Sequence, residues 1–271
     1  MKSINPDTRR GFLARSLSAG AACALARVGT ADEVQSTPQN IRALDTHVYV
    51  GRWPFARLPG DEPANLVGML REHGVTTAWT GNFDGLFHKD IASVNERLAH
   101  TCAKFGDGIL KPLGTVNPTL PDWENDVRRC HETFHFSGIQ LHPNYHGYTL
   151  DDPRFARLLD LATDHGLAVH LIAWLEDEPR KWLRPREAEV DLKPLARTVS
   201  KIPNAKVVIA NGVRSARDDV FQELARLEQV SFDFGRLSDP DDFDQLIAAT
   251  SAKRIVFGSG APLYPISQAA N

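Results

Sequence analysis

The chain has 271 residues, of which 42% are hydrophobic and 24% charged, with a formal net charge of −3. This length accommodates one large α/β domain or two small ones. The slightly acidic balance provides no basic surface and argues against a nucleic-acid partner. Only two cysteines, Cys102 and Cys130, lie beyond the N-terminal segment, so a hydrophobic core rather than a disulfide framework has to stabilise the fold.

The first thirty residues are typical of an export signal. The run TRRGFL at residues 8–13 precedes a short apolar stretch, and an A-x-A cleavage pattern follows at residues 24–26. Paired arginines followed by Gly-Phe-Leu resemble the twin-arginine signal, and the apolar stretch is too short to span a membrane. We predict a signal peptide over 1–30, a linker over 31–40 and a periplasmic or exported protein; the alternative is a basic amphipathic N-terminal helix.

Short apolar runs alternate with amphipathic patterns over residues 41–271. The runs predict eight strands, at 43–49, 76–81, 110–116, 138–142, 168–173, 206–210, 230–234 and 254–257. The amphipathic segments predict seven helices, at 64–72, 91–104, 123–134, 153–164, 192–201, 216–227 and 241–249. This alternation indicates an α/β fold with a parallel sheet, and eight units in about 230 residues predict a (β/α)8 TIM barrel.

Two further features of the pattern bear on the architecture. A doubly wound open sheet is the alternative fold, but no G-x-G-x-x-G follows the first strand. Residues 263–271 provide about two turns of helix, so the eighth helix is expected to be short or missing. An uncovered seam at this place would make a homodimer plausible.

Three strand-end motifs carry a family resemblance. They are His47-Val48-Tyr49, the G-x-x-L-H-P turn at 138–143, and Gly258-Ser259-Gly260. Together they resemble the amidohydrolase-related family of metal-dependent TIM barrels, over residues 44–262. The resemblance implies an active site at the C-terminal ends of the strands, a zinc-type divalent metal, and hydrolysis or decarboxylation of a small carboxylated or cyclic molecule.

The sequence departs from the family pattern at most of the expected ligand positions. His47 keeps the first metal ligand that the resemblance implies. The changed positions are Tyr49, Ile172, Asn211 and Gly260. His170 lies two residues before Ile172 on the same strand face, where it is either a second ligand or a hydrogen-bonded core residue. The predicted metal site, His47 with His170, is therefore degenerate, and the expected cofactor is none or a weakly bound Zn.

Other polar residues near the strand ends complete the candidate site, since barrel sites lie at this end. The candidates for acid–base or carbonyl-orienting roles are His47, His142, Asn211, Asp84 and Asp233. The candidates for substrate contact are Arg52, Asn82, Asn117, His146, Tyr148, Trp174 and Arg214. An arginine here, Arg236 included, could clamp a carboxylate, whereas an ordinary surface ion pair is the alternative for each charged candidate.

The sequence predicts an amidohydrolase-like hydrolase or decarboxylase for a small carboxylated or cyclic molecule, with an atypical or lost metal site. The alternative is a non-catalytic periplasmic barrel that binds a small ligand.

Overall fold

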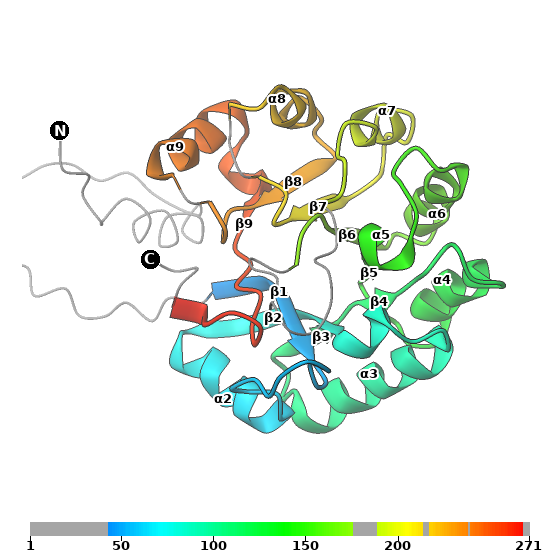
Figure 1. Cartoon of the computed structure of the whole chain (residues 1–271), viewed down its shortest axis with the longest axis vertical. Helices are drawn as coiled ribbons and strands as arrows, with labels where there is room; N and C mark the ends of the chain where they lie inside the picture. The colour runs from blue at the N-terminus through cyan, green and yellow to red at the C-terminus, as the bar shows by residue number, and fades with distance from the viewer. Residues whose placement is uncertain (1–42, 176–188, 214–216, 238, 268–271) are drawn as a thin grey trace, which may run out of the picture.

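A computed structural model describes residues 43–175, 189–213, 217–237 and 239–267. Figure 1 shows their strands gathered at the centre of the molecule with the helices outside them. The predicted signal peptide, the predicted linker and Arg214 lie outside the described residues.

The parallel strands follow one another around a barrel in chain order. One sheet contains β1 (Ala43–Val50), β2 (Val75–Asn82) and β3 (Leu110–Pro112). The other contains β4 (Gly114–Thr115), β5 (Gly138–Leu141), β6 (Ala168–Ile172), β7 (Val207–Ala210), β8 (Val230–Asp233) and β9 (Ile255–Val256). The predicted third strand is thus divided at Leu113, with β3 pairing to β2 and β4 pairing to β5.

The barrel closes between β1 and the segment that contains β9. Bridges join Asp45 to Phe257 and Val48 to Ala261. Counting β3 and β4 as one position, eight strand positions surround the interior, which confirms the predicted (β/α)8 barrel.

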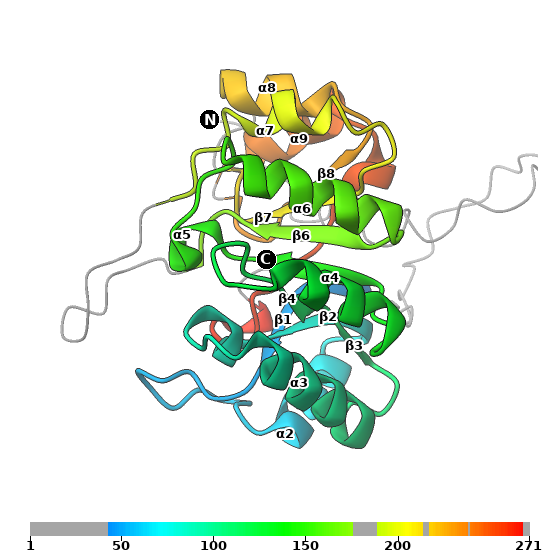
Figure 2. The same cartoon turned by 90° about the vertical axis from the view of Figure 1, so that its right-hand side faces the viewer.

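Within the described ranges, seven helices connect the strands on the outside of the barrel. Figure 2 shows this layer of helices from the side. They are α2 (Pro63–Glu72), α3 (Ile91–Phe105), α4 (Trp123–Glu132), α6 (Pro153–Asp164), α7 (Leu195–Val199), α8 (Asp219–Ala225) and α9 (Pro240–Ala249). Three short turns of helix were not predicted: η1 (Phe83–Leu86), α5 (Pro143–His146) and η2 (Ala252–Arg254). After β9, Ile266 and Ser267 are helical, and the described residues end there.

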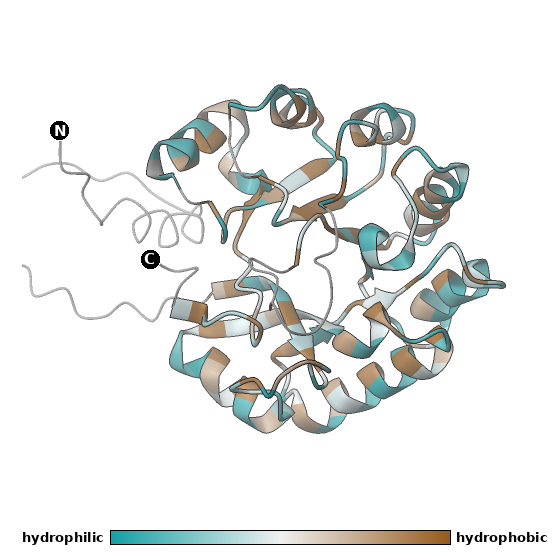
Figure 3. Cartoon of the chain, in the orientation of Figure 1, coloured by the Kyte–Doolittle hydropathy of each residue, from teal (hydrophilic) through white to brown (hydrophobic). Residues whose placement is uncertain are grey.

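Helix α6 illustrates how the sequence specifies these elements. Asp152 accepts a hydrogen bond from the Arg154 amide at 2.8 Å, and Pro153 occupies the first helical turn. Gly166 follows the helix with a φ of +70°, a conformation that glycine adopts without strain. The buried face of the helix consists of Phe155, Leu158, Leu159 and Ala162. Figure 3 shows the same division, with apolar colours on the inner sides of the helices.

A small apolar cluster lies apart from the main core, at or after the C-terminal ends of the strands. Its buried members are Tyr49, Trp53, Leu58, Phe83, Leu86, Ile172, Leu175 and Ala210. The cluster forms one wall of the candidate site. Over the part of the chain that the structure describes, no helix is long and apolar enough to cross a membrane.

Candidate active site

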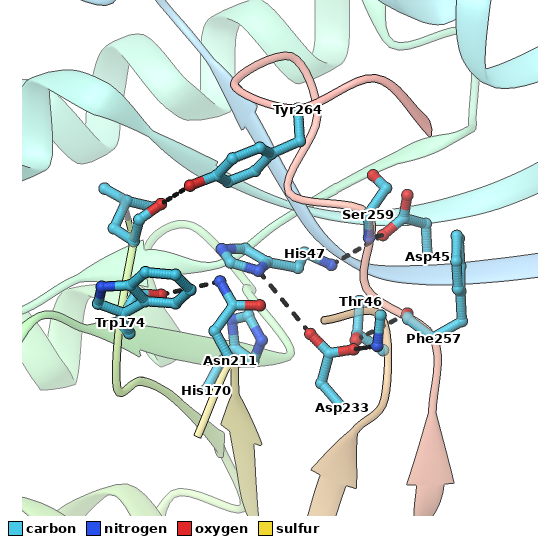
Figure 4. Close-up of polar contacts among 12 residues, drawn as sticks. Asp45, Thr46, His47, His170, Trp174, Asn211, Asp233, Phe257, Ser259 and Tyr264 are labelled. Atoms are coloured by element: carbon cyan, nitrogen blue, oxygen red, sulfur yellow. Dashed lines mark hydrogen bonds and ion pairs between the residues drawn. The ribbon is translucent and has the colours of Figure 1, made fainter. Parts of the chain in front are cut away.

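Polar side chains from several strand ends meet around His47 inside the barrel. Its Nδ1 atom lies 3.9 Å from Oδ2 of Asp233, which ends β8. Its Nε2 atom lies 3.3 Å from the Tyr49 hydroxyl, and its ring centroid lies 5.4 Å from that of His170 on β6. Figure 4 shows His47 between Asp233 and Tyr264, with His170 behind Asn211. His47, Tyr49 and His170 are fully buried, and Asp233 is 2% exposed.

The backbone of His47 is fixed by the turn after β9. Asp45 Oδ1 accepts hydrogen bonds from the amides of His47 and Ser259, each at 3.0 Å. The amide of Gly260 donates to the His47 carbonyl at 2.8 Å. Gly260 has a φ of +73°, which an L-residue adopts only with strain. The Gly-Ser-Gly segment therefore holds His47 through backbone contacts, in place of the acidic ligand that the resemblance implies there.

Asp233 approaches His47 closely because Gly258 has no side chain. A Cβ atom at position 258 would lie 2.4 Å from Oδ2 of Asp233 and 2.8 Å from Cβ of His47. The other carboxyl oxygen of Asp233 accepts from the Gly235 amide at 2.7 Å. The glycine thus determines the geometry of the Asp233–His47 pair.

Burial makes the neutral forms of both partners the stable ones. It raises the pKa of Asp233 to about 8. Burial and, to a smaller extent, the positive charge of nearby Arg236 lower the pKa of His47 to about 3. At pH 7 the pair therefore consists of a protonated carboxyl group beside a neutral imidazole.

The Tyr49 hydroxyl joins His47 to His142. It lies 2.9 Å from Nε2 of His142, which follows β5. The phenol ring stacks on Phe83 with a centroid distance of 4.6 Å and an interplanar angle of 7°. The stacking fixes the hydroxyl between the two imidazole rings, and burial lowers the pKa of His142 as well.

Three predicted asparagines stabilise the loops around the site. Asn211 has a φ of +56°, and its Nδ2 donates to the Trp174 carbonyl at 2.8 Å. Asn82 accepts from the Asp84 amide at 2.9 Å and begins η1. Asn117 accepts from the Thr119 amide at 3.0 Å. Their side chains shape turns, and Asn211 is the one that lies beside the buried cluster in Figure 4.

The other predicted residues lie away from the His47 cluster or at its edge. Arg52 forms an exposed ion pair with Glu62 at 2.9 Å, and Asp84 forms one with Arg97 at 2.8 Å. The structure therefore places both predicted charges in surface pairs. Their roles in the reaction stay predictions.

Two aromatic predictions fall on the segment after β5. His146 lies at the edge of the cluster, where its Nε2 donates to the Gly85 carbonyl at 2.9 Å. Tyr148 belongs to the main hydrophobic core. The predicted loop that carries them is in fact the short helix α5 and its C-terminal turn.

Arg236 and Tyr264 lie beside the site and contact each other, and no sequence motif pairs them. The Arg236 guanidinium lies 4.1 Å from the centroid of the Tyr264 ring. The Tyr264 hydroxyl donates to the Leu175 carbonyl at 2.8 Å, which connects the segment after β9 to the end of β6. Tyr264 belongs to no recognisable sequence motif. Its contacts with Arg236 and Leu175 form only when the barrel closes.

The donor groups do not fit a family-type divalent metal. Nε2 of His47 contacts Tyr49, and Nδ1 of His170 accepts from Gln140 at 3.2 Å. Across the described ranges, no group of three or more His, Cys, Asp or Glu side chains is arranged to hold an ion. Among the residues that the structure describes, no further His, Cys, Asp or Glu side chain completes a ligand set with His47 and His170.

Unsatisfied polar atoms are concentrated in this region. Within the described residues, the buried atoms that lack a hydrogen-bond partner include Asp45 Oδ2, His47 Nδ1, Gln140 Oε1, His142 Nδ1, His170 Nε2, Asn211 Oδ1 and Asp233 Oδ2. Buried polar groups nearly always have a partner, because leaving one unpaired costs about 1–3 kcal/mol. Such a concentration is typical of a functional site rather than of a stabilising core.

Fold and site together define a (β/α)8 barrel with a buried acid–base cluster at the C-terminal ends of its strands. The amidohydrolase family model (Amidohydro_2) matches residues 44–268. The chain belongs to this amidohydrolase family. Comparison with the curated proteins gave no match.

Solved structures share the fold at low sequence identity. A 5-carboxyvanillate decarboxylase from Novosphingobium aromaticivorans, with bound manganese, has a TM-score of 0.62 at 15% identity, covering 84% of this chain and 89% of its own. A 2,6-dihydroxybenzoate decarboxylase from Rhizobium has a TM-score of 0.58 at 14% identity, covering 84% and 90%. A TIM-barrel protein from Bordetella bronchiseptica has a TM-score of 0.62 at 14% identity, covering 84% and 89%. At these identities the likeness establishes the fold.

Proposed function

We propose that this barrel is an enzyme that decarboxylates a small carboxylated molecule, with Asp233 as the proton donor and without a family-type metal. The observation that carries the proposal is the buried contact between Asp233 and His47. Non-oxidative decarboxylation leaves an electron pair on carbon as CO2 departs, and this carbon then takes up a proton. A carboxyl group that stays protonated at neutral pH is suited to donate it.

The same chemistry argues against hydrolysis. Hydrolysis needs a general base or a metal to activate water. Asp233 is protonated at pH 7 and the pKa of His47 is about 3, so both are poor bases there. A proton donor is the more natural role for the pair.

The surroundings suit a planar, carboxylated substrate. Tyr49, Trp53 and Phe83 form an aromatic wall on one side of the cluster. Arg236 provides positive charge near His47 and can attract a carboxylate. Two of the structurally similar barrels are decarboxylases of carboxylated aromatic compounds, which supports small aromatic carboxylates as the substrate class.

The proposal is tested by CO2 release from a panel of hydroxylated and methoxylated benzoates. Asp233→Asn keeps the size of the side chain and removes the acidic proton, so we expect a loss of at least 100-fold in kcat. Asp160→Asn is the matched control, because Asp160 lies exposed on α6 and pairs only with Arg157 among the ion pairs described. Full activity of Asp233→Asn would refute the proposed role.

A non-catalytic ligand-binding barrel is the second candidate. The observation that favours it is the donor set around His47, which does not fit the family's metal. Tight binding of an aromatic carboxylate without CO2 release, unchanged in Asp233→Asn, would support this candidate.

We also propose that the chain is exported through its twin-arginine segment. The support is the TRRGFL run with the apolar stretch and A-x-A pattern after it. Expression of the full chain in a Gram-negative host, followed by fractionation, should place the wild type in the periplasm. The double substitution Arg9→Lys and Arg10→Lys should retain the precursor in the cytoplasm.

A further inference from the structure

Aromatic side chains extend from the buried cluster at His47 to the surface of the molecule. Tyr49 stacks on Phe83 at a centroid distance of 4.6 Å. Trp53 contacts Phe83 at 5.2 Å and Phe87 at 5.9 Å. Exposure rises along this row, from 0% at Phe83 through 3% at Trp53 to 41% at Phe87. The aromatic wall of the candidate site therefore continues outward to the solvent.

Two further rings lie at the outer end of this row. The Phe55 ring lies 5.7 Å from that of Phe87 with an interplanar angle of 84°, and the Tyr145 ring lies 5.7 Å from it with an angle of 82°. These near-perpendicular contacts have the edge-to-face geometry that aromatic pairs prefer. The outer aromatic group consists of Phe55, Phe87 and Tyr145, which come from the segment after β1, the end of η1 and α5. Closure of the barrel thus gathers them from three separate loops.

Phe87 exposes an unusual amount of apolar surface for a residue at this end of the barrel. Leu44, Phe87 and Phe105 are the large apolar residues that the described part of the chain exposes. Leu44 lies near the start of β1 and Phe105 ends α3. Both belong to the opposite end of the barrel, because the helices run antiparallel to the strands. A planar apolar group that covered Phe87 would remove this surface from water and gain ring contacts as well.

We propose that the outer aromatic group is a second subsite, which binds an additional aromatic ring of the substrate. The subsite rests on the proposed function, because it assigns the far end of the molecule whose carboxylate lies at Asp233. A single-ring acid held there contacts the inner rings of Tyr49 and Phe83. A second ring, fused to the first or linked to it, reaches Phe87. The substrate class is thereby narrowed to carboxylated aromatic compounds with two rings.

Calorimetric titration of the full chain with two acids that differ by one fused ring tests the subsite. The acids are 4-hydroxybenzoate and 6-hydroxy-2-naphthoate, and the wild type should bind the second at least tenfold more tightly. Phe87→Ala should lower the ratio of the two affinities about fivefold, since it removes one aromatic pair and its buried area. Phe87→Leu keeps the apolar bulk without the ring and should lower the ratio by a smaller factor.

Phe105→Ala is the matched control. Phe105 is 40% exposed, close to the 41% of Phe87, and it lies at the other end of the barrel. This variant should leave the affinity ratio at the wild-type value. An equal ratio in the wild type and in Phe87→Ala would overturn the proposal, as would a wild type that does not prefer the two-ring acid.

A third ligand, 2-naphthol, separates the subsite from the proposed reaction, because it has two rings and no carboxylate. If its affinity falls in Phe87→Ala while no acid releases CO2, the subsite is supported and the proposed decarboxylation fails. If single-ring acids release CO2 and the affinity ratio does not depend on Phe87, the reaction is supported and the subsite is overturned.

Sedimentation velocity covers the remaining occupant, a second copy of this chain. If Phe87→Ala converts a dimer into a monomer and leaves the affinity ratio unchanged, the outer aromatic group is an interface between copies and the proposal is overturned. The same oligomeric state in the wild type and in Phe87→Ala, together with a lowered ratio, supports a substrate subsite.

Discussion

The Oδ2 atom of Asp233 lies 3.9 Å from Nδ1 of His47, and neither side chain is exposed to solvent. The contact joins the end of β8 to β1 across the C-terminal end of the barrel. The acidic partner of His47 thus comes from β8, whereas the turn after β9, which carries Gly260, contributes backbone bonds.

The Asp233–His47 pair predicts an unusual dependence of stability on pH. The pKa of Asp233 is about 8 in the folded protein and 3.8 in the unfolded reference, so its stabilising contribution is complete below 3.8 and is lost as pH rises through 8. Buried histidines act in the opposite direction, and their effect persists above 6.5 until the unfolded imidazoles have lost their protons. Measured against Asp233→Asn, which keeps the same histidines, the wild type should therefore lose free energy of unfolding between pH 6.5 and 8, by at most about 1.4 kcal/mol per pH unit.

Urea denaturation of the full chain at pH 6.5, 7.2 and 8 measures this slope. Asp233→Asn cannot release a proton, so the wild type should lose stability relative to this variant as pH rises over this range. Parallel profiles of the two proteins would show that Asp233 is already ionised in the folded protein.

A second prediction concerns Gly258, which lies against Asp233 and His47. Gly258→Ala would place a Cβ atom 2.4 Å from Asp233 Oδ2, so the strand or the pair has to shift. Overpacking of this kind costs about 1–3 kcal/mol. Gly68→Ala is the matched control: no atom lies within 4 Å of its Cβ position on α2, and the substitution should stabilise the helix by up to about 1 kcal/mol. Equal stability of the two variants, measured by thermal denaturation, would contradict this geometry.

The fold could be predicted from the sequence because local signals are strong. Apolar runs separated by amphipathic segments give all eight strand positions within a few residues, and Asp152 and Gly166 mark the ends of α6. The interruption at Leu113 was missed because it depends on pairing with two different neighbours.

The site could be predicted only in part. His47, His142 and Asp233 stand at strand ends, where barrel chemistry is expected. Their mutual contacts depend on barrel closure and on side-chain packing, for which a single sequence carries no local signal. The sequence likewise carries no local signal for the Arg52–Glu62 ion pair or for the hydrogen bond from Tyr264 to Leu175, because folding brings these residues together.

A third prediction concerns metal. Because the described donors do not form a three-ligand group, 1 mM Zn²⁺ or Mn²⁺ should leave the Tm of the protein unchanged, and a chelator should not lower it. A metal ion that did bind, at a hundred times its Kd, would raise the free energy of unfolding by about 2.7 kcal/mol and so raise the Tm. A metal-dependent rise in Tm that disappears in His47→Ala would show that the donors around His47 do bind a metal ion.

A fourth prediction concerns Tyr264, which lies on one side of His47. Tyr264→Ala removes the ring drawn above His47 in Figure 4, together with its contact with Arg236. Burial is the largest cause of the low pKa of His47, so this pKa should rise from about 3 toward 6.5. Tyr264→Phe keeps the ring and removes the hydroxyl that donates to the Leu175 carbonyl, so it should leave the pKa of His47 low. Equal pKa values in both variants, measured by NMR titration, would show that Tyr264 does not shield the imidazole.

Carbon-13 NMR of the labelled aspartate carboxyl groups measures directly the protonation state of Asp233, on which its proposed role depends. Asp233→Asn identifies the signal by its disappearance. We expect a midpoint near pH 8 for this carboxyl group, which makes it a proton donor at neutral pH. A midpoint below pH 5 would show a buried carboxylate at pH 7 and would contradict the proposed role.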